Sequence, residues 1–166
     1  MSLASINGAA FHSSDECEGG VHRMPVNYRF DFNIIVIYMA GGYTVNDVRA
    51  TLLNSLADPE RPPDSFLLFN FGESQSIYTR STEEIQTMTD FFASTGNRYN
   101  YRLAFASSHD LPYALQHFVS VKSRSYGITS EVFQTFNEAR EWLVSEYLST
   151  SQQAQALQTT NERQFH

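Results

Sequence analysis

The chain has 166 residues with a formal net charge of −7, and 42% of its residues are hydrophobic. This length and hydrophobic fraction fit one folded domain and exclude a chain that is disordered throughout. The acidic balance lacks the basic footprint of a nucleic-acid-binding protein. Cys17 is the only cysteine, so no internal disulfide can form, and no apolar run is long enough to span a membrane. With no signal-peptide pattern at the N-terminus, the sequence predicts a cytoplasmic protein.

Residues 1–24 mix Gly, Ser, Ala and Asn without a hydrophobic period and are predicted to form a flexible N-terminal arm. Two strands are expected after it. Aromatic and charged residues alternate over residues 28–32, which is the period of a half-exposed strand, and residues 34–40 are apolar on both faces. Asn33 lies between them, so the domain is predicted to open with a hairpin.

A first helix is predicted after Gly41 and Gly42, which end the second strand. Thr44 is a good N-cap, and the proline-rich segment 58–64 cannot continue a helix. Between them, apolar residues recur at helical spacing. This predicted stripe consists of Val45, Val48, Leu52, Leu53 and Leu56.

The central βα unit covers residues 65–92. Residues 66–71 form an apolar run typical of a strand that is buried on both faces, and Gly72 ends it. A polar loop follows, and Ser81 with Glu84 has the spacing of a capping box at a helix start. Parallel sheets bind ligands or partners beyond the carboxyl ends of their strands. We therefore expect the loop of residues 72–82, exposed and rich in hydroxyl groups, to belong to the working surface.

A further strand is predicted over residues 101–106, followed by a helix with Asp110 as its N-cap and Pro112 in its first turn. That helix is expected to end near Lys122, where a loop leads to a short edge strand over residues 131–134.

Thr135 and Glu138 form a second capping box, which begins the last helix. Trp142 and Leu143 are predicted to pack this helix onto the sheet. The Gln-, Ser- and Thr-rich residues 149–166 are expected to form a polar C-terminal tail that is disordered or weakly helical.

The resulting order of elements is ββαβαβαβα. Strands that alternate with single helices predict an α/β fold with a mostly parallel sheet of βα units and an added N-terminal strand. No internal repeat or second domain is visible, so residues 25–148 are predicted to form one domain.

Two segments resemble the SpoIIAA-like (STAS-like) family. Residues 102–115 read RLAFASSHDLPYAL and residues 131–143 read EVFQTFNEAREWL. The family typically reads R-x-A-x-x-A-x-x-D-x-x-Y-G and E-V-x-x-F-x-x-x-x-E-A-x-x-W-L at these places. The resemblance covers residues 27–148, and it implies a single SpoIIAA-like domain of the kind found in anti-sigma-factor antagonists and transporter-linked STAS domains.

The chain departs from that family at the position of its regulatory serine. The antagonists carry a phosphorylatable serine in Asp-Ser-x-Gly at the start of the second helix, where this chain has Arg80, Ser81, Thr82 and Glu83. Asn70 also stands where the family favours Asp, and Ala114 replaces the usual Gly. A phosphate would have to go to Ser81 or Thr82, and an ordinary helix cap is the alternative role for Ser81.

No enzyme, metal or cofactor motif is found. Asp90 with Glu83 and Glu84 lies on one helix rather than in a cleft, no serine has the nucleophile-elbow setting, and Cys17 with His12 and His22 offers too few zinc ligands. Gly41-Gly42 matches no nucleotide motif. His109 could donate to an anion near a helix start or simply face solvent. The candidate binding or switch residues are Ser74, Ser76, Tyr78, Arg80, Ser81, Thr82, His109 and Asp110.

Two functions are consistent with these patterns. The first is a non-catalytic regulatory or protein-interaction module whose partner meets the loop of residues 72–82. The second is a carrier or sensor for a small apolar or lipid-like ligand, which the many aromatic residues favour. Self-association, most simply as a homodimer, is expected for the same reason. Four arginines could gather on one edge or, as is more usual for scattered arginines, simply face solvent: Arg80, Arg98, Arg102 and Arg124. An aromatic set of this kind forms a core more often than it lines a ligand site; its members are Phe66, Phe69, Phe71, Tyr78, Phe91, Phe92, Tyr99 and Tyr101.

Overall fold

A computed structural model describes residues 25–72 and 74–164, so the arm predicted for residues 1–24 lies outside the described residues. The strands are β1 (Val26–Asp31), β2 (Ile34–Met39), β3 (Phe66–Gly72), β4 (Arg102–Ser107) and β5 (Thr129–Phe133). The helices are α2 (Val45–Ala57), η1 (Ser76–Thr79), α3 (Thr82–Ser94), η2 (Gly96–Tyr99), α4 (Tyr113–His117), η3 (Phe118–Lys122), α5 (Ser123–Ser125) and α6 (Phe136–Gln164).

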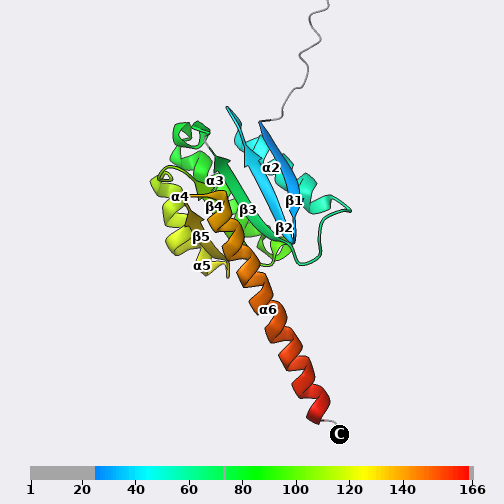
Figure 1. The fold of residues 1–166 in the computed structure, drawn as a ribbon. Helices are drawn as coiled ribbons and strands as arrows, with labels where there is room; N and C mark the ends of the chain where they lie inside the picture. Colours follow the sequence, from blue (N-terminus) through cyan, green and yellow to red (C-terminus); the bar gives the residue numbers. More distant parts are fainter. Residues whose placement is uncertain (1–24, 73, 165–166) are drawn as a thin grey trace, which may run out of the picture.

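The five strands form one sheet in the order β1-β2-β3-β4-β5, in which β1 is antiparallel to β2 and the other pairs are parallel. The predicted α/β fold and its ββαβαβαβα order are confirmed. Because β2 to β5 run in the same direction, their carboxyl ends share one edge of the sheet, the carboxyl edge, at the top of Figure 1. The opposite end, where these strands begin, is the amino edge.

Each face of the sheet has its own buried cluster, because successive strand residues point to opposite faces. The larger cluster joins the sheet to α2, α3 and α4, and its strand residues include Ile35, Ile37, Leu67, Phe69, Leu103 and Phe105. The smaller cluster joins the sheet to α6 and consists of Ile34, Val36, Phe66, Leu68, Ala104, Ala106, Ala139 and Leu143. Three helices therefore cover one face, while α6 covers the other (Figure 1).

The last helix, α6, crosses the sheet from the carboxyl edge to the amino edge. Its first residue, Phe136, stacks on Tyr38 near the end of β2, whereas Tyr147 touches Phe66 at the start of β3. Leu143 lies between them and is fully buried. Trp142 is half-buried and packs against Phe133 of β5 and the smaller cluster, so both residues pack α6 onto the sheet as predicted, but only Leu143 is fully buried.

Several predicted boundaries differ from the structure. The strand expected over residues 131–134 begins two residues earlier, at Thr129, and the helix expected to end near Lys122 continues to Ser125. Leu53, expected in the apolar stripe of α2, is exposed, because the stripe that faces the sheet is narrower than the hydrophobic pattern. Of the two alternatives expected for the C-terminal segment, a disordered tail or a weak helical extension, residues 149–164 have the helical one, as a continuation of α6.

The burial of Leu143 generates a stability prediction. Leu143→Ala should lower the free energy of unfolding by about 2–5 kcal/mol, because truncating a fully buried leucine leaves a cavity between α6 and the sheet. Chemical denaturation followed by circular dichroism would measure this change. Trp142→Ala should cost less, and Glu141→Ala, at an exposed position on the same helix, should change stability by no more than about 0.5 kcal/mol. Equal midpoints for Leu143→Ala and the wild type would contradict the packing described above.

An ion pair between β1 and α6 generates a prediction about pH. Arg140 donates through Nε and Nη2 to the two carboxylate oxygens of Asp31, at 2.7 and 3.0 Å, and these bonds hold the pKa of Asp31 below its usual value. Because the folded pKa is the lower one, the pair stabilises the fold above the unfolded pKa of about 3.9, and this contribution disappears as the pH falls through the folded pKa.

Asp31→Asn should therefore flatten the acid side of the stability–pH curve and should lower stability at pH 7 by about 0.2–1 kcal/mol, the range for partly exposed pairs. Urea denaturation between pH 3 and pH 7 would test this. Glu131→Gln, at an exposed carboxylate on β5, is the matched control and should keep the acid dependence of the wild type. If the stability of Asp31→Asn fell with acid as steeply as that of the wild type, the Asp31–Arg140 pair would not be a source of the acid dependence.

Candidate functional site

The strand β3 leaves the sheet at the carboxyl edge through a local distortion. Asn70 Oδ1 accepts a hydrogen bond from the Gly72 amide at 3.0 Å, and the register of β3 against β4 shifts between these two residues. Gly72 has a φ of +53°, a conformation that residues with a side chain rarely adopt. Asn70, which stands where the resembled family favours Asp, thus shapes the exit of the central strand.

Two serines tie the loop after β3 to the loop after β2. Ser74 Oγ donates to the Gly41 carbonyl at 2.9 Å. Ser76 Oγ accepts from the Tyr43 amide and donates to the Tyr43 carbonyl, both at 3.4 Å. Both serines are buried, as is Ile77. The prediction of an exposed polar loop is therefore wrong at its centre. There the serine hydroxyls supply the hydrogen-bond partners that backbone groups of the two adjoining loops would otherwise lack.

Arg80 is held in place by three contacts. Its Nη2 donates to Ser76 Oγ at 2.8 Å, its Nη1 lies 3.4 Å from Glu84 Oε1, and its guanidinium lies 5.2 Å from the centre of the Tyr43 ring. Burial raises the pKa of the Tyr43 hydroxyl far above its usual value. The Tyr43 hydroxyl and Arg80 Nε are both buried, and neither has a hydrogen-bond partner among the described residues. Arg80 is thus a structural part of the loop rather than a freely moving cation.

Ser81 begins α3 as a helix cap. Its Oγ accepts from the Glu84 amide at 3.1 Å, and Glu84 Oε2 accepts from the Ser81 amide at 2.9 Å, so the predicted capping box is present. The hydrogen bond from the Ser81 amide is also the main reason that the pKa of Glu84 lies below its usual value. Thr82 follows as the first residue of α3 and is exposed. Of the two roles left open for Ser81, the structure contains the cap.

The loop after β4 contacts the loop after β3. The Tyr78 hydroxyl lies 3.3 Å from Ser107 Oγ, and the Tyr78 ring meets the His109 ring edge-on at 6.4 Å. Ser108 Oγ donates to the Gly72 carbonyl at 3.3 Å. His109 itself is exposed. The carboxyl edge therefore brings together most of the residues that the sequence singles out.

Asp110 does not have the role predicted for it. The N-cap of α4 is Pro112, which makes no side-chain cap, and Asp110 lies two residues before it, exposed to solvent. The physical reason is the proline, because a residue that precedes proline is kept out of the helical region. The proline thus disfavours a helical Leu111, and the helix begins after Pro112, later than Asp110 as N-cap would require.

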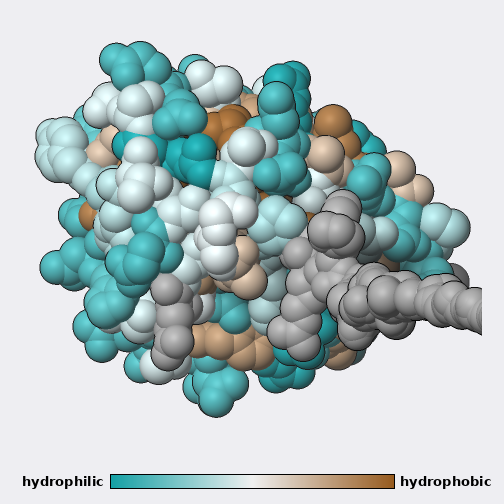
Figure 2. Space-filling view, turned by 90° about the horizontal axis from the view of Figure 1, so that it is seen from above, coloured by the Kyte–Doolittle hydropathy of each residue, from teal (hydrophilic) through white to brown (hydrophobic). Residues whose placement is uncertain are grey.

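Two hollows lie at the carboxyl edge. The first, of about 600 Å³, lies between the loops after β2 and β3 and is lined by residues that include Ala40, Gly42, Ser74 and Gln75. The second, of about 380 Å³, lies between the loop after β4 and the end of β5 and is lined by residues that include His109, Asp110, Gln116 and Gln134. Figure 2 looks onto the carboxyl edge, where hydrophilic and intermediate residues predominate over scattered hydrophobic ones.

Two tyrosines are exposed on this surface. Tyr78 has 36% of its surface accessible, and Tyr113 at the start of α4 has 81%. The Tyr113 ring packs loosely on His117, 6.2 Å away, one turn along the helix. An aromatic side chain with this much exposure gains free energy whenever another surface covers it.

Other sequence candidates lie elsewhere. Arg102 pairs with Glu146 at the amino edge, whereas Arg80 lies at the carboxyl edge, so these two arginines do not gather on one edge. Asp90 pairs with Lys122 rather than with another carboxylate. Cys17, His12 and His22 lie outside the described residues.

Two residues of the site were not singled out by the sequence. Tyr43 precedes the N-cap Thr44, and both Tyr43 and Val48 are buried in the larger cluster, so the pattern of a hydrophobic staple was available as a signal. Tyr113 carried a weaker signal, because a residue directly after a proline that begins a helix belongs to an exposed first turn.

The capping role of Ser81 generates a prediction. Ser81→Ala should lower the free energy of unfolding by about 1 kcal/mol, and Ser81→Asp should largely restore it, because both Ser and Asp accept the bond from the Glu84 amide. Thermal or urea denaturation would measure both variants. Thr82→Ala, at the neighbouring exposed position, is the control and should stay within about 0.5 kcal/mol of the wild type. If Ser81→Asp were as unstable as Ser81→Ala, Ser81 would not act mainly as a cap.

The chain was compared with known proteins. No protein-family model matches it, and no curated protein matches it either. Among the solved structures similar to it is an uncharacterized protein of the DUF3478 family with a SpoIIAA-like fold from Shewanella loihica PV-4. The identity is 16%, the TM-score is 0.48, and the match covers 71% of this chain and 91% of that chain.

Proposed function

We propose that this chain is a non-catalytic regulatory module that binds a partner protein through the carboxyl edge of its sheet. The observation that carries the proposal is the exposure of Tyr113, together with Tyr78, on a surface of interlocked loops. Tyrosine is enriched at protein interfaces and among the residues that contribute most to binding energy. The cytoplasmic location expected from the single cysteine belongs to the same proposal.

The loops of this surface support binding because they are already fixed. The bonds from Ser74 to Gly41, between Ser76 and Tyr43, and from Ser108 to Gly72 join the loops after β2, β3 and β4. A surface that is ordered before binding loses little conformational entropy when a partner arrives. Tyr78 is part of this ordered set through its contacts with Ser107 and His109.

The arrangement of hydroxyl groups favours a binding role over catalysis. A serine nucleophile needs a base within hydrogen-bond distance. Ser107 Oγ donates to the His109 carbonyl at 2.8 Å rather than to its ring, and the hydroxyls of Ser76 and Ser81 are engaged in loop and cap bonds. Within residues 25–72 and 74–164, no three His, Cys, Asp or Glu side chains could jointly hold a metal ion.

The alternative, a carrier of an apolar or lipid-like ligand, has less support. The aromatic residues that suggested it pack on one another, with Phe69 4.4 Å from Phe92 and 5.7 Å from Phe105 between ring centres. Phe69, Phe71, Phe92 and Tyr99 are buried in the core, whereas Tyr78 and Tyr101 of the same set are exposed. Within residues 25–72 and 74–164, no helix is long and apolar enough to cross a membrane.

If phosphorylation regulates partner binding, the phosphate would go to Ser81 or Thr82 at the start of α3. Free amides and the helix dipole favour negative charge there. The neighbouring Glu83 and Glu84 already supply such charge, and Glu84 occupies the Ser81 amide. The proposal therefore places the binding surface at the carboxyl edge without requiring a phosphate.

The proposal predicts that partner binding depends on Tyr113 and Tyr78. The tagged full chain would be used to capture proteins from a lysate of its source organism, and captured proteins would be quantified by mass spectrometry. Tyr113→Ser and Tyr78→Ser should each reduce capture of the partner at least about tenfold, as expected when an interface loses a main aromatic contact.

Tyr126→Ser is the matched control for this experiment. Tyr126 is the same residue type with 45% of its surface exposed, but it precedes β5 and so lies toward the amino edge. The Tyr126→Ser variant should still capture the partner. A partner lost with Tyr126→Ser but kept with Tyr113→Ser would move the binding surface away from the carboxyl edge and defeat the proposal.

A further inference from the structure

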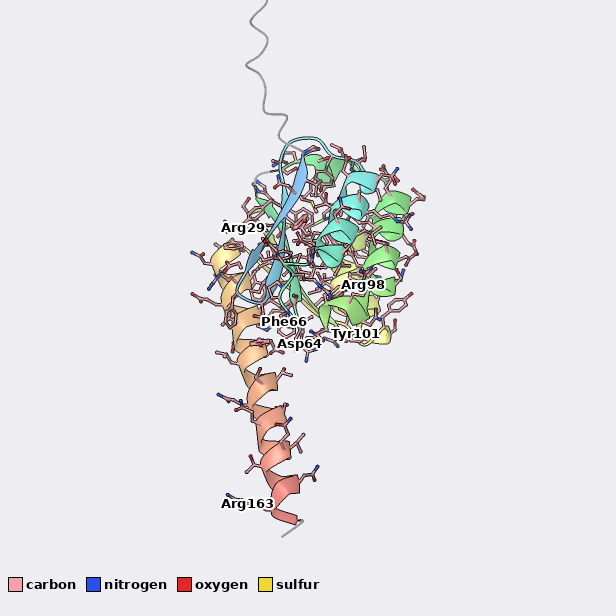
Figure 3. All side chains as sticks on the ribbon, turned by 90° about the vertical axis from the view of Figure 1, so that its right-hand side faces the viewer. Arg29, Asp64, Phe66, Arg98, Tyr101 and Arg163 are labelled. Carbon is pink, nitrogen blue, oxygen red and sulfur yellow. The ribbon has the colours of Figure 1, made fainter. Side chains whose placement is uncertain are left out.

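The helix α6 has an inner half that packs on the sheet and an outer half that leaves it. The outer half, residues 148–164, is called the α6 extension here. Figures 1 and 3 show it projecting from the amino edge, with Arg163 at its far end. Leu148 is 49% exposed and Leu157 is 70% exposed. Among the extension side chains that the structure describes, Ser151 is the most covered, and it is only partly so.

The composition of the extension does not explain a helix that stands alone in water. No charged residue occurs between Tyr147 and Glu162, so the extension gains nothing from ion pairs one turn apart over most of its length. A helix of roughly 12–15 residues is marginal in water even when it is rich in alanine. Packing against another surface is the usual source of the missing stability.

A notch in the amino edge lies directly beside the extension. It has a volume of about 370 Å³ and is lined on the body side by Asp64, Phe66, Asn100 and Arg102. Its other wall is α6, with Tyr147, Thr150, Ser151 and Ala154. Figure 3 shows Asp64, Phe66 and Tyr101 at the end of the body from which α6 departs.

Exposed aromatic residues lie at this end of the molecule. Phe32, in the turn between β1 and β2, is 55% exposed, and Tyr101, before β4, is 41% exposed. Phe32 and Phe66 both contact the Tyr147 ring edge-on, at 5.5 and 6.0 Å between centres. The buried seam beneath α6 thus continues outward as a partly apolar surface that none of the described residues covers.

We infer that the chain forms a symmetric homodimer in which the α6 extension of each copy lies along the amino edge of the other. The contacting face of the extension is the one that bears Thr150, Ser151, Ala154 and, one turn further, Leu157. This goes beyond the proposed partner surface, which lies at the opposite edge. The sequence predicts self-association but does not say where, and the structure assigns it to this edge.

The dimensions agree with this arrangement. Residues 148–164 extend about 25 Å at 1.5 Å per residue. Five strands spaced about 4.8 Å apart give an edge of about 19 Å between the outer two. The extension is therefore long enough to reach across the whole amino edge of a second copy.

The charge of the extension favours a second copy as the occupant. The chain has a net charge of −7, so two copies repel one another over most of their surfaces. The extension from Leu148 to Asn161 is uncharged and can approach the amino edge without that repulsion. Each copy supplies one extension and one edge, so the two contacts close a twofold dimer and leave neither exposed.

The test is sedimentation equilibrium of the full chain, with two matched variants on the extension. Ala154 lies on the face that lines the notch, whereas Ala156 lies on the opposite face. Ala154→Glu should raise the dimer dissociation constant at least about tenfold, because it buries a larger, charged side chain in the contact. Ala156→Glu adds the same charge and should leave the dissociation constant within about twofold of the wild type.

A second pair of variants tests the receiving edge. Phe32 and Tyr101 have φ values of +57° and +53°, so asparagine, which tolerates this conformation, can replace each without disturbing the turn. The double variant Phe32→Asn, Tyr101→Asn should weaken the dimer as Ala154→Glu does. Tyr113→Ser, on the carboxyl edge, should leave the dimer intact, so failure here and failure of the proposed partner surface are distinguishable.

Circular dichroism would check that the variants are folded, since every variant should unfold cooperatively at a midpoint close to that of the wild type. A concentration of about 100 micromolar lies well above the dissociation constants of stable dimers. A chain that is still monomeric at this concentration would overturn the inference. So would equal effects of Ala154→Glu and Ala156→Glu. A dimer that is sensitive to Ala154→Glu but not to the Phe32 and Tyr101 pair would mean that the helices contact each other, and it would equally overturn the assignment to the amino edge.

Discussion

The structure depends on the covering of both faces of a parallel sheet. Strands β2, β3 and β4 are apolar on both sides, so neither face tolerates water. Three helices in succession cover one face, and α6 alone covers the other. Ala104 and Ala106 on β4 are small, which allows Ala139 and Leu143 of α6 to come close to the strands. One helix therefore closes the second half of the core.

This constraint also fixes the direction of α6 and gives the two edges different characters. Since α6 begins immediately after the carboxyl end of β5, it can cover the sheet only by running back toward the amino edge. Its continuation must then leave the body at that edge, beside Phe66 and Tyr147. The carboxyl edge is left free of α6 beyond its first turn, and the loops after β2, β3 and β4 form its surface.

Those loops are held by side chains that replace backbone partners. Ser74 and Ser76 join the loop after β3 to the loop after β2, and Arg80 is sandwiched between Ser76, Glu84 and the Tyr43 ring. The residues that looked most like a reactive set in the sequence are mainly the ones that fix the shape of this edge. Two of the side chains that stay exposed at this edge, Tyr78 and Tyr113, are aromatic, and the proposed partner surface is built on them.

The sequence by itself determined the elements and their order, because those depend on local patterns. The apolar run of β3, the capping boxes at Ser81 and Thr135, and the glycines after β2 act within a few residues, and each is present in the structure. The tertiary structure alone decided which hydroxyls are free. Ser74 and Ser76 read as an exposed loop, but their partners, Gly41 and Tyr43, lie 33 residues earlier in the chain, and no local pattern encodes such a contact. It also decided that residues 149–164 continue α6 and project from the amino edge, because that depends on the direction in which α6 must cross the sheet.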